Sequence, residues 1–273
     1  MGILDESAAL AEERLGRAAG KLTIERLTIG LFFTGVKLSN GASGVCFTPV
    51  KEIPDAVCCP SSAARSFDPV RIPGTEVRSA LAALDSPEPI KTAVAIATLN
   101  ALSAACWERG LTGGLRVQEG VDGQDKIHMP QDASVAVVGA FGPVLAKLRA
   151  RGGEWWIIEQ DPRTLREDER AHFVPADQSS ETIRHADVLV VTGVTLINHT
   201  LEGILSAAAP GAEIAVIGPT AGLLPEPLFQ RGVRMVGGVW VKKPDQLLDV
   251  LAAGGSGYHF FDRSAVRTVI EKD

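Results

Sequence analysis

The stretch DVLVVTGVTLINHTLEGILSAAAPGAEIAVIGPTAG, residues 187–222, decides the fold class of this chain. Residues 188–191 and 214–217 are short apolar runs rich in β-branched residues, which is typical of strands covered on both faces. The apolar segment between them predicts a helix over 196–209. Strand, helix and strand in this order indicate a parallel sheet of the α/β class.

Polar and small residues gather where each of these two strands ends. They are Thr192, Gly193, Thr195 and Asn198 after the first strand, and Gly218, Pro219 and Thr220 after the second. Because the carboxyl ends of parallel strands meet at one edge of a sheet, we expect these residues to line one ligand cavity.

The start of the predicted helix carries the most reactive side chains. With Thr195 as the cap, Thr195, His199 and Glu202 stand at i, i+4 and i+7 on one face. His199 and Glu202 suit two ligands of a divalent cation, with a third from elsewhere, or a catalytic acid–base pair. The alternative is a capped helix with a solvated His–Glu pair. The helix N-terminus itself favours an anionic group on the ligand.

Outside this stretch, the chain divides into two parts that differ in the order of their predicted strands and helices. Residues 4–20 predict an amphipathic helix, the runs 27–38 and 44–48 a hairpin about the turn 39–43, and 76–84 and 90–109 helices. The charged, glycine-containing segment 119–132 interrupts this pattern, and strands then alternate with helices. We therefore predict a small α+β domain over 1–118 and a doubly wound, mostly parallel sheet domain over 119–273.

Composition excludes several classes of protein. A net charge of −6 and a pI near 5.5 argue against a nucleic-acid surface. No apolar run has the length of a membrane span, and the acidic start of the chain is unlike a signal peptide, so a cytoplasmic location is expected. The four cysteines are expected to be reduced thiols.

Further candidates for the site lie outside residues 187–222. Gly139 and Gly142 flank a turn after a predicted strand and are candidates for binding a small nucleotide or another ligand. Glu159 ends the next strand, at the position that would bind ribose hydroxyls. The bulky Phe141 departs from a dinucleotide-binding fingerprint. The alternative is a tight turn between a strand and a helix.

Two other groups of residues are candidates, each with a structural alternative. Cys58 and Cys59 are candidate metal ligands or a nucleophile, or else small buried residues. Thr34 and Lys37 are predicted to face the cleft, where Lys37 would pair with an anionic ligand, or else to be ordinary strand residues. Gly237 and Gly238 are predicted to end a strand beside the site.

Several long runs resemble a known family. They are GLFFTGVKLSNGASGVCFTP (30–49), CCPSSAAR (58–65), VVTGVTLINHTLEGIL (190–205), GPTAGLLPEPLFQRGV (218–233) and KKPDQLLDVLAAGGSGYHFF (242–261). The chain is similar over nearly its whole length to the "putative heavy-metal chelation" family, a family of unknown function. The resemblance implies an enolase-N-terminal-like first domain, a Rossmann-like second domain and a cleft between them.

These observations support two functions. The first is a protein that binds a small anionic or metal-chelating ligand, or a divalent metal ion, in the cleft, in heavy-metal chelation, metal homeostasis or metallophore metabolism. The second is an enzyme that acts on a small anionic metabolite in the same cleft. The expected partner is a small-molecule or metal ligand, with no nucleic acid and no membrane. The sequence does not decide between a monomer and a homodimer.

Overall fold

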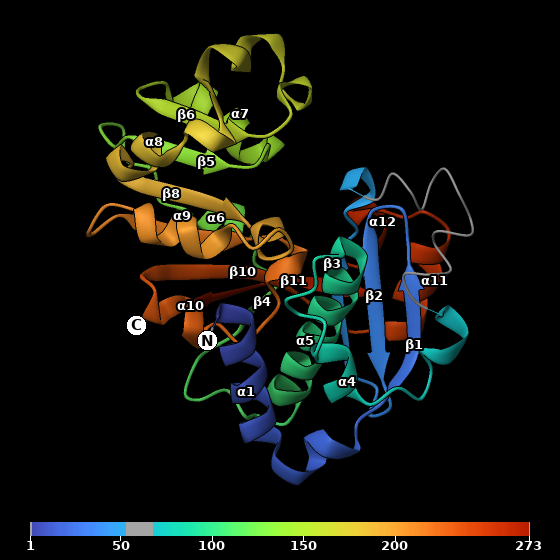
Figure 1. The fold of residues 1–273 in the computed structure, drawn as a ribbon. Coiled ribbons are helices and arrows are strands. Elements are labelled where there is room, and N and C mark those ends of the chain that lie inside the picture. Colours follow the sequence, from blue (N-terminus) through green and yellow to red (C-terminus); the bar gives the residue numbers. More distant parts are fainter. Residues whose placement is uncertain (1, 53–67, 273) are drawn as a thin grey trace.

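The computed structural model describes residues 2–52 and 68–272, which form two sheets with helices around them (Figure 1). The smaller sheet is antiparallel, in the order β1-β2-β3. Its strands are β1 (Ile24–Ile29), β2 (Phe33–Leu38) and β3 (Ser43–Phe47). The predicted hairpin about residues 39–43 is confirmed as β2 and β3. The run 27–38 is not one strand, because a turn at residues 30–32 divides it into β1 and β2.

Helices cover both faces of the smaller sheet. On one side lie α1 (Ile3–Leu15), the 3-10 helix η1 (Gly16–Lys21), α4 (Val77–Leu81) and the central helix α5 (Pro89–Glu108). On the other side lie α11 (Pro244–Ala252) and α12 (Gly257–Phe260), which come from the far end of the chain (Figure 1). The helices predicted over 76–84 and 90–109 are confirmed as α4 and α5.

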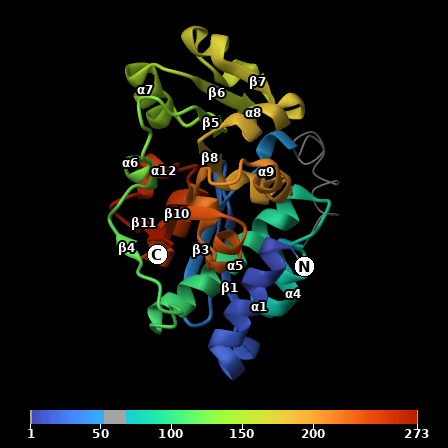
Figure 2. The same ribbon diagram turned by 90° about the vertical axis from the view of Figure 1, so that its left-hand side faces the viewer.

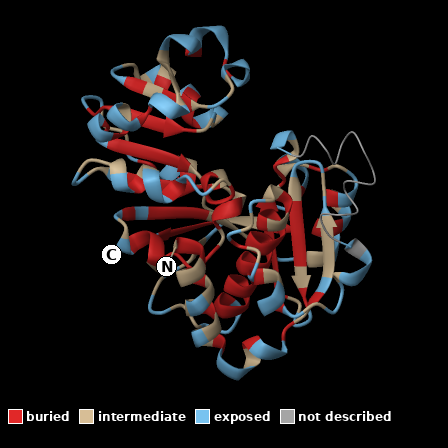
Figure 3. Ribbon diagram, in the orientation of Figure 1, coloured by how far each residue is buried: buried red, intermediate tan, exposed pale blue. Residues whose placement is uncertain are grey.

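Helix α5 is the core of this part of the protein (Figure 3). Among the described helices it alone is long and apolar enough to cross a membrane, yet 94% of that stretch is buried inside the protein. Its small residues allow a very close approach of β3, since a Cβ on Gly44 would lie 2.3 Å from the backbone nitrogen of Ala101. The core helix of a protein can be as long and as apolar as a membrane span, and burial to this extent is typical of such a core helix.

The larger sheet has eight strands in the order β4-β11-β10-β9-β8-β5-β6-β7. They are β4 (Gln118–Glu119), β5 (Val135–Val138), β6 (Trp155–Glu159), β7 (Phe173–Pro175), β8 (Val188–Thr192), β9 (Glu213–Ile217), β10 (Val233–Val241) and β11 (Ala265–Glu271). The strands from β7 to β10 are parallel, and β11 and then β4 extend the sheet beyond β10 as antiparallel strands. The α/β fold class and the mostly parallel sheet are confirmed.

Helices lie on both faces of this sheet, as a doubly wound fold requires (Figure 2). α6 (Gly123–Lys126) and α7 (Gly142–Arg151) lie on one side, and α8 (Ser180–His185) and α9 (Leu201–Ala207) on the other. α10 (Glu226–Gln230) follows β9 and contacts α1. The short 3-10 helices η2 (Val50–Glu52), η3 (Pro69–Arg71), η4 (Pro162–Thr164), η5 (Glu167–His172), η6 (Ala176–Gln178), η7 (Gly193–Leu196) and η8 (Pro219–Ala221) complete the connections.

Two sequence-based expectations about these elements are wrong. The helix predicted over 196–209 begins only at Leu201, because η7 and a turn occupy residues 193–200. Gly237 and Gly238 lie inside β10 rather than at its end, and both pair with β11. β11 was not predicted from the sequence. The boundary predicted at residues 118 and 119 stays a prediction.

Candidate functional site

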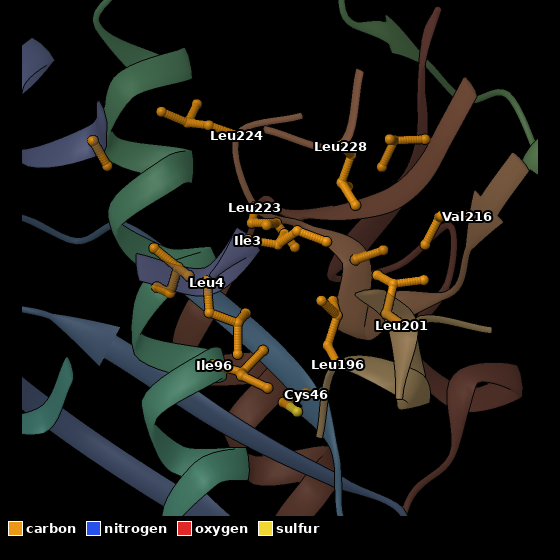
Figure 4. Close-up of a cluster of buried hydrophobic side chains, with 14 of the residues drawn as sticks. Ile3, Leu4, Cys46, Ile96, Leu196, Leu201, Val216, Leu223, Leu224 and Leu228 are labelled. Carbon is orange, nitrogen blue, oxygen red and sulfur yellow. The ribbon is translucent and has the colours of Figure 1, made fainter. Parts of the chain in front are cut away.

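A cavity of about 170 Å³ lies between the first turn of α1 and the segment that joins η7 to α9. We call it the α1–α9 cavity. It is lined by Gly2, Ile3, Leu4, Asp85, Thr195, Leu196, His199, Leu201 and Glu202. The leucines and Ile3 belong to the buried apolar cluster drawn in Figure 4, which forms the inner wall. Three of the residues singled out in the sequence, Thr195, His199 and Glu202, therefore share one cavity.

His199 owes its position to an irregular turn rather than to a helix face. Its φ angle is +58°, in the left-handed region, where a residue other than glycine is uncommon. The turn is held by the side chain of Asn198, whose Oδ1 accepts hydrogen bonds from the backbone N–H and the hydroxyl of Thr200. The expected i, i+4, i+7 face is thus absent, because His199 precedes α9 and stands in a backbone conformation that interrupts the helix.

Thr195 is buried and does not cap a long helix. Its hydroxyl donates to the carbonyl of Thr192 over 2.6 Å, whereas the Thr192 hydroxyl accepts from the N–H of Val194 and caps η7. The two threonines therefore fix the backbone between β8 and the cavity. Thr195 contributes to the cavity wall, and Thr192 does not line it.

Glu202 connects the cavity to the first turn of α1. Its Oε1 accepts a hydrogen bond of 2.7 Å from the N–H of Ile3, and it lies 3.6 Å from the guanidinium of Arg231. The side chain is still about half exposed, at 49%. Glu202 is therefore a partly compensated carboxylate that closes one side of the cavity and remains open to a ligand.

Asp85 is the charged lining residue that no sequence pattern predicted. It lies in the loop between α4 and α5, is exposed, and forms no ion pair with another described residue. A single aspartate in a loop carries no local signal of function. Only the packing of α1 and α5 against the larger sheet brings this carboxylate to the cavity of His199 and Glu202.

The two strand ends that motivated the sequence analysis do meet. A Cβ on Gly193 would lie 3.0 Å from the nitrogen of Ala221, so η7 and η8 are in contact. Thr220 is nonetheless buried, and its hydroxyl accepts from the N–H of Phe47 in β3. Gly218 and Pro219 shape the same turn. In the structure Thr220 joins the two sheets, and Gly218, Pro219 and Thr220 do not line the α1–α9 cavity.

Asn100 of α5 strengthens this junction. Its Nδ2 donates to the carbonyls of Val45 and Thr220, so one side chain binds β3 and η8 together. Its Oδ1 is buried without a partner among the described residues. The turn after β9 is therefore used for assembly of the two sheets.

The turn after β5 lies at the point where the strand order reverses. β5 is followed by β6 on one side and lies against β8 on the other, which is where α/β sheets commonly hold ligands. Gly139 has a φ of +95°, and a Cβ there would lie 3.0 Å from Cγ2 of Thr192. Gly142 begins α7, and Glu159 ends β6 with its carboxylate on the N–H of Gln160. These residues are separate from the α1–α9 cavity.

Four other candidates have structural partners. Thr34 is fully buried and shares a hydrogen bond with the hydroxyl of Thr48. Lys37 forms ion pairs with Glu25 and with Asp245 of α11, so it fastens α11 to the smaller sheet. A Cβ on Gly237 would lie 3.0 Å from Cγ2 of Ile217, and one on Gly238 3.2 Å from the carbonyl of Ala221. Both glycines allow neighbouring segments to pack closely against β10, Ile217 at Gly237 and Ala221 at Gly238.

The structure describes two of the four cysteines, Cys46 and Cys106. Cys58 and Cys59 lie outside the described residues. Cys46 and Cys106 are free and buried, and burial raises the pKa of the Cys106 thiol to about 11 and that of Cys46 further still. The Cys46 and Cys106 thiols are therefore protonated at neutral pH and are poor nucleophiles and metal ligands.

The donor groups of the described residues do not form a complete site for a bare metal ion. Over residues 2–52 and 68–272, no three His, Cys, Asp or Glu side chains are grouped closely enough to hold one. His199, Glu202 and Asp85 line one cavity without meeting at a single point. The described part of the chain thus does not fit a resident metal centre made of protein ligands alone.

Together, the strand order and the elements above define an α/β protein with a small antiparallel sheet packed against a Rossmann-like sheet. The family model described as "Putative heavy-metal chelation" (DUF364) matches residues 122–270, more than half of the chain, and the chain belongs to this family. A second model with the same description (DUF4213) matches residues 12–103.

Two solved structures share the whole fold. A DUF364 protein of unknown function from Pyrococcus horikoshii is 21% identical, with a TM-score of 0.77 over 99% of this chain and 100% of that one. A DUF364 protein of unknown function from Desulfitobacterium hafniense DCB-2 is 18% identical, with a TM-score of 0.73 over 98% of this chain and 99% of that one. No curated protein matches the chain. At these identities the likeness shows the fold alone.

Proposed function

We propose that this protein binds a small ligand with a cationic group, either a protonated amine or a chelated divalent metal ion, in the α1–α9 cavity. The main support for this proposal is the combination of ionisable side chains and an apolar wall around the cavity. Two carboxylates, Asp85 and Glu202, and the imidazole of His199 surround a space with an apolar inner wall. Ligand sites commonly combine apolar walls with a few polar groups that orient the ligand.

The charges of the cavity favour a cation over the anion expected from the sequence. Asp85 has no ion-pair partner among the described residues, and Glu202 shares Arg231 with Glu6. The anionic ligand was expected at the N-terminus of a helix beginning near Thr195, whereas α9 begins at Leu201, and the carboxylate of Glu202 already accepts from the N–H of Ile3 at the start of α1. Two carboxylates facing one small space attract a positive group and repel a negative one.

A metal ion fits this cavity best when it brings part of its own coordination shell. His199 and Glu202 supply at most two or three donors, and a divalent transition metal takes about four or more. A metal held by a small chelator needs only such a partial set from the protein. This proposal agrees with the description of the family as one of heavy-metal chelation.

Isothermal titration calorimetry with three probes tests the proposal: Ni²⁺ alone, Ni²⁺ with one equivalent of the neutral chelator ethylenediamine, and putrescine. We expect binding of at least one probe, with a loss of about tenfold or more in affinity in Glu202→Gln and Asp85→Asn, since each removes one charge that faces the ligand. Glu167→Gln, an exposed glutamate on η5, is the matched control and should bind as the wild type does. No binding of any probe, or equal binding by all variants, would reject the proposal.

A second candidate is catalysis on the same ligand, and the backbone of His199 is the observation that favours it. Residues held in sparsely populated backbone regions cluster at active sites. His199 stands at φ +58° in a cavity with two carboxylates, an arrangement suited to proton transfer. In that case His199→Ala retains the affinity for the ligand while turnover falls by about 10²- to 10⁴-fold.

The thiols support a cytoplasmic location as part of this proposal. Cys46 and Cys106 are free, and reduced thiols are the common state in the cytoplasm. Alkylation of denatured protein in fresh, unreduced cell lysate, followed by mass spectrometry, tests this location. We expect the label on all four cysteines of the chain. Cysteines that react only after reduction would argue against it.

A further inference from the structure

We infer that a groove at the amino ends of β9 and β10 is a binding site for a small, multiply charged oxyanion. The groove encloses about 660 Å³ and is separate from the α1–α9 cavity. It runs between the loop after α9 and the first residues of the two strands. The residues that line it include four with charged side chains, Glu213, Arg231, Arg234 and Lys272.

Positive charge is concentrated in this groove although the chain as a whole carries −6. Arg231, Arg234 and Lys272 line it, against the single carboxylate of Glu213. Arg234 is exposed and forms no ion pair with another described residue. Arginine presents a planar fork of donors that matches carboxylate and phosphate oxygens.

Arg234 and Lys272 form a like-charge pair across two strands. Met235 pairs with Glu271 in the antiparallel ladder, and the N–H of Lys272 donates to the carbonyl of Arg234. The two cations therefore stand on opposite strands at the same level, an arrangement that is destabilising without a counter-charge. The Lys272 ammonium donates to the carbonyl of Phe229, a neutral group that leaves its charge uncompensated. An oxyanion between the two cations supplies the missing charge.

Arg231 links the groove to the α1–α9 cavity. Its guanidinium donates to both carboxylate oxygens of Glu6, at 2.7 and 3.0 Å, and lies 3.6 Å from Glu202. The hydrogen bond from Arg231 holds the pKa of Glu6 below its ordinary value. Glu202 in turn lines the cavity. One cation thus stands between the two sites.

The sign of the coupling follows from these contacts. An oxyanion in the groove competes with Glu202 for the charge of Arg231 and leaves Glu202 less compensated. The cavity then becomes more negative, so an anion in the groove tightens the binding of a cation in the cavity, and the reverse holds by linkage. The coupling rests on the proposed function of the cavity, whereas the groove assignment does not depend on what the cavity binds.

Calorimetric titration with pyrophosphate and with citrate tests the groove. We expect binding of at least one of them, weaker at high salt, and about tenfold weaker in each of Arg234→Gln and Lys272→Gln, since each variant loses one charge-assisted contact. The two anions distinguish a phosphate from a carboxylate ligand. Arg170→Gln, an exposed arginine on η5, is the matched control. Failure of both anions to bind, or binding that is unchanged in Arg234→Gln and Lys272→Gln, would overturn the assignment.

Glu202→Gln tests the coupling without any ligand in the cavity. Because the neutral amide of this variant no longer shares the charge of Arg231, the groove anion should bind about two- to fivefold more tightly than in the wild type. Glu167→Gln should leave that affinity unchanged. Equal affinity in Glu202→Gln and the wild type would show that the two sites are independent, whatever the cavity binds.

Discussion

Gly44 sets how closely strand β3 and helix α5 approach each other. Gly44 of β3 lies against the backbone of α5, where a Cβ would stand 2.3 Å from the nitrogen of Ala101 and 2.5 Å from the carbonyl oxygen of Ala97. Backbone atoms cannot move aside as the end of a side chain can. The small residues of α5 were visible in the sequence, but the partner of Gly44 was not, because the two segments lie far apart along the chain.

Gly44→Ala should therefore destabilise the protein by about 1–3 kcal/mol or more, the usual range for overpacking a rigid contact. Chemical denaturation measures the free energy of unfolding. Gly20→Ala is the matched control, since nothing lies within 4 Å of a Cβ at Gly20, and it should stay within about 0.5 kcal/mol of the wild type. An equal effect of the two substitutions would disprove the close contact.

Asp187 is a residue whose charge matters for pH dependence. Its carboxylate accepts hydrogen bonds from the hydroxyl and the N–H of Ser134, at 2.7 and 2.8 Å, and so joins the starts of β5 and β8. The hydrogen bond from the Ser134 hydroxyl is the main cause that lowers the pKa of Asp187 below its ordinary value of 3.8. Because the folded-state pKa is depressed, the ionised carboxylate contributes stability that is fully present above pH 3.8.

That contribution should disappear as the pH falls from 3.8 through the lower folded-state pKa. Urea unfolding at a series of pH values should show that the stability difference between wild type and Asp187→Asn is largest at neutral pH and shrinks in acid. Asp132→Asn, at an exposed site, should track the wild type across the range. A difference between wild type and Asp187→Asn that grows in acid would contradict this account.

Periodicity in the sequence predicted most of the sheet strands and the longer helices. β5, β6, β8 and β9 and helices α4 and α5 follow apolar patterns that the sequence displays directly. The helix over 196–209 was predicted to begin too early because its apolar residues suit both a helix and a turn, and His199 adopts a left-handed backbone that no pattern signals. β10 was predicted too short since Gly237 and Gly238 interrupt its apolar run.

Helix α11 is the element that ties the end of the chain to the smaller sheet. Leu248 is fully buried, and its Cδ2 would lie 2.6 Å from a Cβ on Gly35 of β2. Leu248→Ala should lower the free energy of unfolding by about 2–5 kcal/mol, the range for a leucine truncated in a core. Gln246→Ala on the exposed face of α11 should change it by less than about 0.5 kcal/mol. Thermal and urea unfolding of both variants measure this, and similar values for the two would show that α11 is only loosely attached.

The candidate site depends on how two distant parts of the chain meet. His199, Glu202 and Thr195 were identified from their position after a buried strand. Asp85 and the first turn of α1 were not, because nothing local distinguishes them and only the tertiary fold places them in the cavity of His199. The turn with Thr220 was predicted to line the cavity, whereas the structure uses it to join the two sheets.

The proposed function requires that the α1–α9 cavity is the ligand site of this protein. Crystals soaked separately with Ni²⁺, Ni²⁺–ethylenediamine and putrescine provide the test, because difference density locates each probe without reference to any assay. We predict that at least one probe lies in the cavity within hydrogen-bonding or coordination distance of His199, Glu202 or Asp85. Probes bound only elsewhere, for example at the turn after β5, with water alone in the cavity, would contradict the claim.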